Sequence, residues 1–169
     1  SDNHAEGKLL RLTQQYFLVS ASCQSIIRDH MAVYGTLDNL PDKVAIHIND
    51  THPALCIPEL MRILIDDYFY TWDHAWDMVQ RIVSYTNHTV MPEALEKWSV
   101  DLLRELLPRV YLIIEEIDRR WRQGFDQSKP QDRERMAATA VLRDGKVRMA
   151  NLSIIGGHAC NGVAALHTE

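Results

Sequence analysis

The chain has few cysteines and no spacing that would pair them. Cys23, Cys56 and Cys160 are its three cysteines. They lie far apart among apolar residues, which indicates neither a disulfide framework nor a cysteine metal site. An odd number of isolated thiols is typical of a reduced compartment, so the sequence predicts a cytoplasmic location.

Long apolar runs and basic runs are also missing. No stretch approaches the roughly 20 apolar residues that a membrane-spanning helix needs, and the first residues lack the pattern of a signal peptide. The net charge is −5, and no lysine or arginine run forms a phosphate-binding face. The sequence therefore predicts neither a membrane nor a nucleic-acid partner.

Several motifs of well-known catalytic sites are absent. There is no G-x-S-x-G nucleophile turn and no H-E-x-x-H zinc motif. His47 and His52 lack the spacing of metal ligands. Gly156 and Gly157 form an isolated pair without the wider fingerprint of a nucleotide-binding loop. We therefore expect no metal and no nucleotide site of these types.

A strand, a polar turn and a helix follow one another between residues 43 and 66. Val44, Ile46 and Ile48 alternate as in a strand, residues 49–52 (N-D-T-H) form a polar turn, and Pro53 opens an amphipathic helix. This order is typical of α/β proteins, in which ligands bind at the carboxyl ends of the strands. With 169 residues, of which 46% are hydrophobic, the chain is long enough for one domain.

Apolar periodicity, together with proline, glycine and capping residues, predicts the remaining elements. In the first half they are a helix over 8–33, a break over 35–42, a helix capped by Thr71 and a short strand over 82–86. A helix opened by Pro92 and a helix capped by Ser99 and kinked at Pro108 follow. The last part contains a polar loop over 124–131, a hairpin over 140–149 with Asp-Gly at its turn, a short strand within 151–163, and the start of a helix at the end of the chain.

Three turns carry histidine and asparagine after strand-like segments. They contain Asp50 with His52, Asn87 with His88, and His158 with Asn161. If the strands belong to one open α/β sheet, these turns line one crevice. The alternative is a capping or turn-stabilising role, since Asn, Asp and Thr bond neighbouring backbone groups. The spacing alone leaves both interpretations open.

The aromatic residues offer a weaker signal. The four tryptophans, at positions 72, 76, 98 and 121, can in principle stack on a sugar. Three of them occupy helical positions with apolar neighbours, which favours packing in the core or at an interface.

Several motifs in this order resemble those of α-glucan phosphorylases, the glycogen and maltodextrin phosphorylases. They are A-I-H-I-N-D-T-H-P-A-L-C-I-P-E-L-M-R-I-L at 45–64, Y-T-N-H-T-V-M-P-E-A-L-E-K-W at 85–98, G-H-A-C-N-G-V-A at 157–164, G-K-L-L-R-L-T-Q-Q-Y-F at 7–17 and L-L-P-R at 106–109. The resemblance covers nearly the whole chain.

The resemblance implies a helix-rich α/β portion of a Rossmann-like GT-B glycosyltransferase. Residues 1–169 correspond to the later part of its N-terminal domain, without the C-terminal domain. Such enzymes cleave terminal α-1,4-glucosidic bonds with inorganic phosphate and release α-glucose 1-phosphate. They carry pyridoxal 5′-phosphate on a lysine in the C-terminal domain, and that lysine has no counterpart here. We therefore expect an active, homodimeric parent enzyme and an inactive, self-associating isolated chain.

The resemblance also implies roles for particular residues. His88 matches a residue that contacts the glucosyl unit and whose main-chain carbonyl faces the charge developing on the sugar. Asp50 and His52 match catalytic-site residues with positioning roles. Glu96 matches an acidic residue at the edge of the pocket, and Asn161 and Val163 match residues near the bound glucose. With Asn87, these are the expected substrate-binding residues.

One position departs from the regulated animal members of the family. These have an Arg-Arg pair in a nucleotide effector site, whereas the chain has Arg28-Asp29. A carboxylate in place of a guanidinium weakens phosphate binding, so AMP activation is not expected. Two further readings stay open, a stand-alone oligosaccharide-binding module and a non-catalytic scaffold.

Overall fold

The computed structural model describes residues 2–89, 91 and 95–162, with side chains at positions 4–89, 91 and 95–160. The helices are α1 (Asp2–Tyr34), α2 (Leu40–Lys43), α3 (Cys56–Arg62), the π-helical segment η1 (Ile63–Asp67), α4 (Trp72–Ile82), α5 (Val100–Leu106), α6 (Pro108–Arg122), α7 (Pro130–Thr139) and α8 (Met149–Gly156). The strands are β1 (Ile46–Asn49), β2 (Val83–Asn87), β3 (Lys97–Ser99), β4 (Leu142–Arg143), β5 (Lys146–Arg148) and β6 (Ala159–Gly162). The predicted mixture of helices and strands is confirmed.

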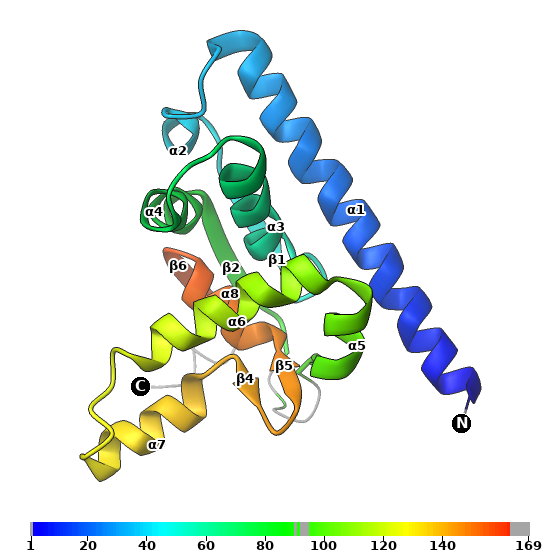
Figure 1. Ribbon diagram of the computed structural model, residues 1–169, viewed down its shortest axis with the longest axis vertical. Helices are drawn as coiled ribbons and strands as arrows, with labels where there is room; N and C mark the ends of the chain where they lie inside the picture. Colours follow the sequence, from blue (N-terminus) through cyan, green and yellow to red (C-terminus); the bar gives the residue numbers. More distant parts are fainter. Residues whose placement is uncertain (1, 90, 92–94, 163–169) are drawn as a thin grey trace.

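The first helix runs along one side of the molecule (Figure 1). It covers the predicted range of 8–33 and begins earlier, at Asp2. Its buried stripe includes Leu12, Cys23 and Ile27, whereas Phe17 on another face is 70% exposed. Because one stripe is buried and the rest is open, α1 lies against the body of the protein rather than within it.

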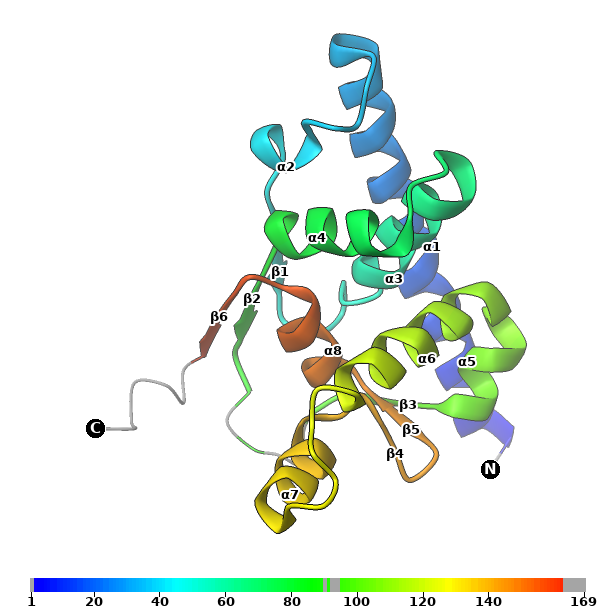
Figure 2. The same cartoon turned by 60° about the vertical axis from the view of Figure 1, so that its left-hand side comes forward.

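Three parallel strands form the first sheet, in the order β1-β2-β6. Figure 2 shows them side by side, with their arrowheads toward the same edge. Thr86 of β2 pairs with Asn49 on one side and with Asn161 on the other. The carboxyl ends of all three strands therefore lie at one edge, as the sequence predicted for the turns that contain Asp50, His88 and Asn161.

The two faces of this sheet differ in polarity. Ile48 and Tyr85 are fully buried on one face, where α4 and α8 pack against β2. On the other face His47 is exposed and contacts the hydroxyls of Ser84 and Thr86. This separation follows from the two-residue period of a strand.

A second, antiparallel sheet has the order β3-β5-β4. It contains the predicted hairpin, whose turn residues Asp144 and Gly145 have φ of 53° and 72°. Positive φ at both central residues is what a tight two-residue hairpin turn requires, and Asp-Gly supplies it at low cost. The third strand of the sheet, β3, was not predicted.

The helix expected from Pro53 begins later, at Cys56. Between the two positions the backbone bonds run three residues back, from the N–H of Ala54 to the carbonyl of Thr51 and from that of Cys56 to that of Pro53. Four-residue bonding starts with the N–H of Glu59 and the carbonyl of Leu55. A series of tight turns therefore separates the polar loop from α3.

Both predicted caps are confirmed. The Thr71 hydroxyl accepts from the His74 N–H at 3.3 Å, and that of Ser99 accepts from the Leu102 N–H at 3.3 Å. Pro108 has a stronger effect than the predicted kink, because it divides the expected long helix into α5 and α6. Leu107 between them has φ −130° and ψ 65°, consistent with the exclusion of helical geometry before proline.

Three α-helices were not predicted: α2, which begins within the break expected over 35–42, α7 and α8. The polar loop predicted over 124–131 ends early, since Pro130 occupies the first turn of α7. The short strand predicted within 151–163 is confirmed as β6, but the apolar segment before it forms the unpredicted helix α8, six of whose residues are buried. Six buried residues in a helix of eight leave no single apolar stripe for a periodic pattern to reveal. The helix predicted from Pro92 and the one predicted at the end of the chain lie outside the described residues.

Candidate functional site

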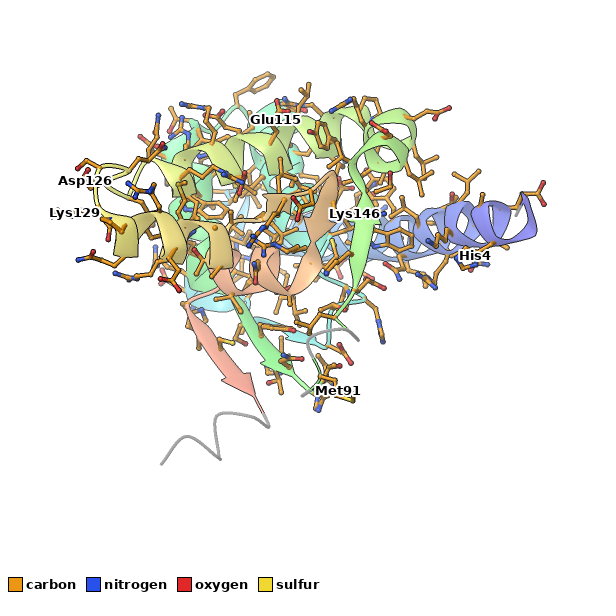
Figure 3. The ribbon with its side chains drawn as sticks, turned by 90° about the horizontal axis from the view of Figure 1, so that it is seen from below. His4, Met91, Glu115, Asp126, Lys129 and Lys146 are labelled. Atoms are coloured by element: carbon orange, nitrogen blue, oxygen red, sulfur yellow. The ribbon has the colours of Figure 1, made fainter. Side chains whose placement is uncertain are left out.

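The carboxyl edge of the parallel sheet carries the first candidate site residues. Asp50 follows β1, His88 follows β2, and Asn161 lies within β6 next to its last residue. Figure 3 shows Met91, just beyond the second turn, close to the tip of β2. The parallel register thus brings together loops that are about 40 and 70 residues apart in the sequence.

A side-chain contact joins the first two loops. His88 Nε2 lies within hydrogen-bonding distance of Asn49 Oδ1. Because an amide oxygen only accepts, this contact places a proton on Nε2. The imidazole is exposed, so the contact fixes the ring while the rest of it stays accessible.

Asn87 fixes the backbone on either side of His88. Its Oδ1 accepts a hydrogen bond from the Thr89 N–H at 2.9 Å. This is the geometry of an asparagine turn, in which the side chain replaces a backbone carbonyl. The backbone around His88 is therefore held by Asn87 within the turn, and the imidazole of His88 is held by Asn49 from the neighbouring strand.

Asp50 adopts a left-handed backbone conformation, with φ of 73°. Its N–H donates to the Thr86 carbonyl at 3.0 Å and its Oδ1 accepts from the Thr51 N–H at 2.7 Å. Asp and Asn tolerate this conformation better than other residues with a side chain. Asp50 thus has the turn-stabilising role that was left open as an alternative, at the same edge as His88.

His52 lies two residues further along the same loop. Its side chain is exposed, whereas Thr51 before it is only 4% exposed. The buried threonine anchors the loop and leaves the imidazole of His52 facing solvent near the sheet edge.

Asn161 and Val163 are described to different extents. The backbone of Asn161 pairs with Thr86, which brings position 161 to the site edge. Val163 lies outside the described residues.

Glu96 lies in a different environment. Its Oε2 is 3.5 Å from Gln15 Nε2 of α1, and its carbonyl accepts from the Met149 N–H at 3.2 Å. Its Oε1 is buried without a hydrogen-bond partner among the described residues. These contacts connect Glu96 to α1 and α8 rather than to His88, and its role at the glucose site stays a prediction.

The expectation that His158 joins the same crevice is wrong. His158 precedes β6, its N–H donates to the carbonyl of Val83 at the start of β2, and its Nδ1 is 3.0 Å from the carbonyl of Gln80. In a parallel sheet, residues before one strand lie beside the beginning of its neighbour. His158 therefore lies at the amino edge, opposite His88.

Tyr85 lies beneath the site on the buried face of β2. It is fully buried, and its hydroxyl has no hydrogen-bond partner among the described residues. Burial, with smaller contributions from Asp50 and Cys160, raises the pKa of Tyr85 to about 12. The phenol consequently stays neutral and adds no charge below the loops.

The sequence did not indicate the row of polar side chains beside these loops, formed by His47, Ser84 and Thr86 on the exposed face of the sheet. His47 Nδ1 is 3.1 Å from Ser84 Oγ, and its Nε2 is 2.8 Å from Thr86 Oγ1. Asn49 continues the same face of β1 and holds His88. The alternation of Ile46 and Ile48 with His47 and Asn49 was the available signal, because it assigns the polar pair to one face.

Within the described part of the chain, no cluster of three or more His, Cys, Asp or Glu side chains is arranged to hold a metal ion. No helix among the described residues has the length and apolar character of a membrane span. The site consists of loops, imidazoles, amides and one carboxylate at a sheet edge, which suits recognition of a neutral polar ligand through hydrogen bonds.

Comparison with known proteins agrees with this arrangement. The family model described as carbohydrate phosphorylase matches residues 1–169. The chain is 49% identical to a glycogen phosphorylase of Bacillus subtilis over 99% of its length, and 49% identical to the muscle form of human glycogen phosphorylase over 100% of its length. It spans 21% of the length of each of these relatives. The chain belongs to the carbohydrate phosphorylase family.

Proposed function

We propose that this chain forms one wall of the glucosyl site of an α-glucan phosphorylase. That enzyme cleaves terminal α-1,4-glucosidic bonds of glycogen or maltodextrin with inorganic phosphate and releases α-glucose 1-phosphate. The observation that best supports this proposal is the sequence identity of 49% that nearly the whole chain shares with a bacterial and a human glycogen phosphorylase. The shared edge occupied by the turns of Asp50 and His88 supports it.

In this proposal His88 acts through its main-chain carbonyl. The transition state of glycosyl transfer carries positive charge on the sugar ring, and a fixed carbonyl dipole lowers its energy. Such a dipole helps only if it does not reorient during the reaction. The Asn87 turn and the contact between His88 and Asn49 supply that rigidity.

The other candidates have supporting roles. Asp50 and His52 position the loop after β1, and Asn87 holds the turn around His88. Asn161 and Val163 belong to the third loop, and Glu96 to the border of the site. Sugar hydroxyls donate and accept hydrogen bonds, and the amide, carboxylate and imidazole groups of these residues complement them.

Pyridoxal 5′-phosphate belongs to the remainder of the longer enzyme. The five lysines of the chain, at positions 8, 43, 97, 129 and 146, are all exposed, and Figure 3 shows Lys129 and Lys146 at the surface. An enclosed lysine is needed to hold the cofactor aldehyde, so the lysines here do not fit that group. No step of the proposal passes through it.

The proposal includes the wider architecture. The parallel sheet β1-β2-β6 supports a Rossmann-like N-terminal domain of GT-B type, of which residues 1–169 are one part. The partners are an α-1,4-glucan and inorganic phosphate, and the longer enzyme is a cytoplasmic homodimer. We expect the isolated chain to be inactive, because none of its lysines fits the cofactor.

The test is phosphorolysis of maltoheptaose by the longer enzyme with His88→Ala. We expect a loss of turnover of at least tenfold, since the ring contact that orders the turn is removed. His158→Ala is the matched control, because it removes the same side chain at the opposite edge. Turnover unchanged in His88→Ala would favour the scaffold reading. Micromolar binding of maltoheptaose by the longer protein without phosphorolysis would favour the binding module.

A further inference from the structure

The antiparallel sheet β3-β5-β4, which Figure 2 shows beside α7, has one buried and one polar face. Trp98 and Val147 pair with each other and are 1% and 0% exposed on the buried face. Their neighbours along the two strands are Lys97, Lys146 and Arg148. Because side chains alternate along a strand, these three basic residues lie together on the opposite face.

Strand pairing places the basic residues directly opposite one another. Lys97 is the partner of Arg148 between β3 and β5, and Arg143 is the partner of Lys146 between β4 and β5. The Cβ atoms of such partners are about 4.5–5.5 Å apart, and like charges in this arrangement are destabilising. The sheet therefore contains two unfavourable pairs in place of the opposite-charge pairs that would stabilise it.

The same residues line a pocket of about 220 Å³. Its lining consists of Lys97, Arg143, Asp144, Lys146 and Arg148, so four cationic side chains face one carboxylate. Among the described residues, the only ion pair within this group joins Arg143 Nε and Asp144 Oδ2 at 3.6 Å, and both side chains are exposed. Exposed pairs of this kind contribute little, and the pocket keeps an excess of positive charge.

The two arginines also have a structural role. Arg148 Nη2 donates to the carbonyls of Ala137 and Ala140, the first at 2.8 Å, and Arg143 Nη1 donates to the same Ala137 carbonyl at 3.1 Å. Ala137 lies in the last turn of α7, where cations are favourable beside the final carbonyls. This role fixes both guanidiniums at the pocket, but it does not account for either lysine.

The environment of Arg148 shows that the positive charge is not balanced. Burial, and next the charge of the neighbouring Arg143, lowers the pKa of Arg148. Its Nε is buried without a hydrogen-bond partner among the described residues. A nearby anion favours the charged form of such a group and supplies acceptors for its N–H donors.

We propose that this pocket binds a compact, multiply charged phosphoryl anion of the pyrophosphate type. Arginine guanidiniums and lysine ammonium groups are the usual partners of phosphate oxygens, and the pocket has two of each. Its volume is below the range of about 300–1,000 Å³ that is typical of larger organic ligands. No apolar side chain lines it, which favours a bare oxyanion over a nucleotide.

The pocket is distinct from the candidate site at the edge of the parallel sheet. Its residues belong to the β3-β5-β4 sheet and its hairpin turn, and none of them is a candidate residue of the glucosyl site. The proposal therefore does not rest on the proposed function. No basic run in the sequence indicated the pocket, because its residues come from three strands and meet only when these strands pair.

The test is a calorimetric titration of the full 169-residue chain with sodium pyrophosphate at low ionic strength. We expect saturable binding of one anion. Lys146→Gln should weaken it roughly fivefold, the effect of one unit charge about 4 Å away in water. Lys8→Gln is the matched control, since Lys8 is exposed on α1 outside the pocket, and it should bind like the unaltered chain. Absence of saturable binding, or an equal loss in both variants, would overturn the proposal.

Thermal unfolding separates a ligand site from a structural role of Lys146. Pyrophosphate should raise the unfolding temperature of the unaltered chain by mass action and that of Lys146→Gln by less. Without pyrophosphate, Lys146→Gln should unfold at the same or a higher temperature, because its repulsion with Arg143 is removed. A lower unfolding temperature of the variant without pyrophosphate would mean that Lys146 serves the fold, and would refute the proposal.

Two further titrations test the class of ligand. ADP carries a diphosphate group with a nucleoside attached, and it should bind no more tightly than pyrophosphate, since nothing apolar in the pocket receives the base. Tighter binding of ADP would refute the assignment of a bare oxyanion. Raising the ionic strength from about 0.05 M to about 0.5 M should weaken pyrophosphate binding about tenfold or more through screening. Binding that does not depend on salt would contradict the electrostatic origin.

Discussion

His88 Nε2 and Asn49 Oδ1 lie in hydrogen-bonding contact across two neighbouring parallel strands. The two residues are 39 positions apart in the sequence. Asn49 ends β1 and His88 follows β2, so the contact connects two loops at the edge where ligands bind in open α/β sheets. It turns two separate loops into one unit of the site.

Removing this contact should impair catalysis without unfolding the protein. Asn49→Ala in the longer enzyme should lower kcat/KM for maltoheptaose about five- to tenfold, since one hydrogen bond contributes roughly 1 kcal/mol. The reason is that the His88 turn loses its support from β1. The measurement is initial-rate phosphorolysis, with thermal unfolding to check that the fold persists.

Ser84→Ala is the control for Asn49→Ala. Ser84 Oγ contacts His47 on the same polar face and does not contact His88. If positioning of His88 is what matters, Ser84→Ala keeps its activity. Equal losses in the two variants would mean that the polar face as a whole, rather than the contact with His88, is responsible.

Local patterns predicted the elements that have one polar and one buried side. Alternation identified β1 because Ile48 is buried while His47 is exposed, and a period of about four residues identified α1. The α8 helix was not predicted because six of its eight residues are buried, and β3 was not predicted because its three residues gain strand geometry only by pairing with β5. Such elements depend on tertiary contacts that no local pattern contains.

For the candidate site, too, local patterns predicted the order of strands and turns but not the contacts between them. The strand-turn order predicted that the loops of Asp50 and His88 meet. It did not separate the turn before β6 from the turn after it, so His158 was assigned to the wrong edge. The partnership of Asn49 with His88 depends on the register between β1 and β2, which a single sequence does not specify.

Gly156 is required where α8 approaches α3. A Cβ added there would lie 2.6 Å from Ile57 Cδ1 and 2.8 Å from Ile57 Cγ2. We expect Gly156→Ala to lower the free energy of unfolding by about 1–3 kcal/mol through overpacking, measured by urea denaturation. Gly7→Ala in α1 is the matched control, because nothing lies within 4 Å of its added Cβ. It should be neutral or stabilising, and a loss as large as that of Gly156→Ala would contradict a steric cause.

Asp118 connects α6 to the hairpin. It is 4% exposed and accepts from the backbone N–H of Val141 at 2.8 Å and from Arg122 Nε at 2.7 Å. Asp118→Ala should cost about 2–4 kcal/mol in urea denaturation, since buried donors lose their acceptor. Asp118→Asn should cost less, because an amide oxygen still accepts from Val141.

The exposed pair of Asp101 and Arg104 provides the control for Asp118. The two side chains are 93% and 56% exposed and lie 3.7 Å apart. Asp101→Ala should change the unfolding free energy by no more than about 0.5 kcal/mol. A comparable loss in both variants would show that burial of Asp118 is not what matters.

Self-association of the isolated chain should depend on the open face of α1. Phe17 is 70% exposed there and Leu18 is 65% exposed, and exposed apolar patches of this kind favour association. Light scattering of the chain should report a mass that rises with concentration, and Phe17→Asp should reduce it. The Phe69→Asp variant places the same charge on another exposed site and should have less effect. A monomer at all concentrations would refute the prediction.

Glu116 makes part of the stability dependent on pH. Hydrogen bonds from Arg119 and Arg120 lower the pKa of Glu116 to about 2. In the unfolded chain the pKa of the carboxyl is about 4.3, so its contribution to stability is complete above that pH and is lost as the pH falls toward 2. The Glu116→Gln variant lacks this contribution. Its deficit in unfolding free energy relative to the unaltered chain should be largest at pH 7 and should shrink between about pH 4.5 and 2. Glu105 makes no ion pair among the described residues, so the deficit in unfolding free energy of Glu105→Gln should not change over this pH range. The same pH dependence in both variants would contradict the role of the Glu116 ion pairs.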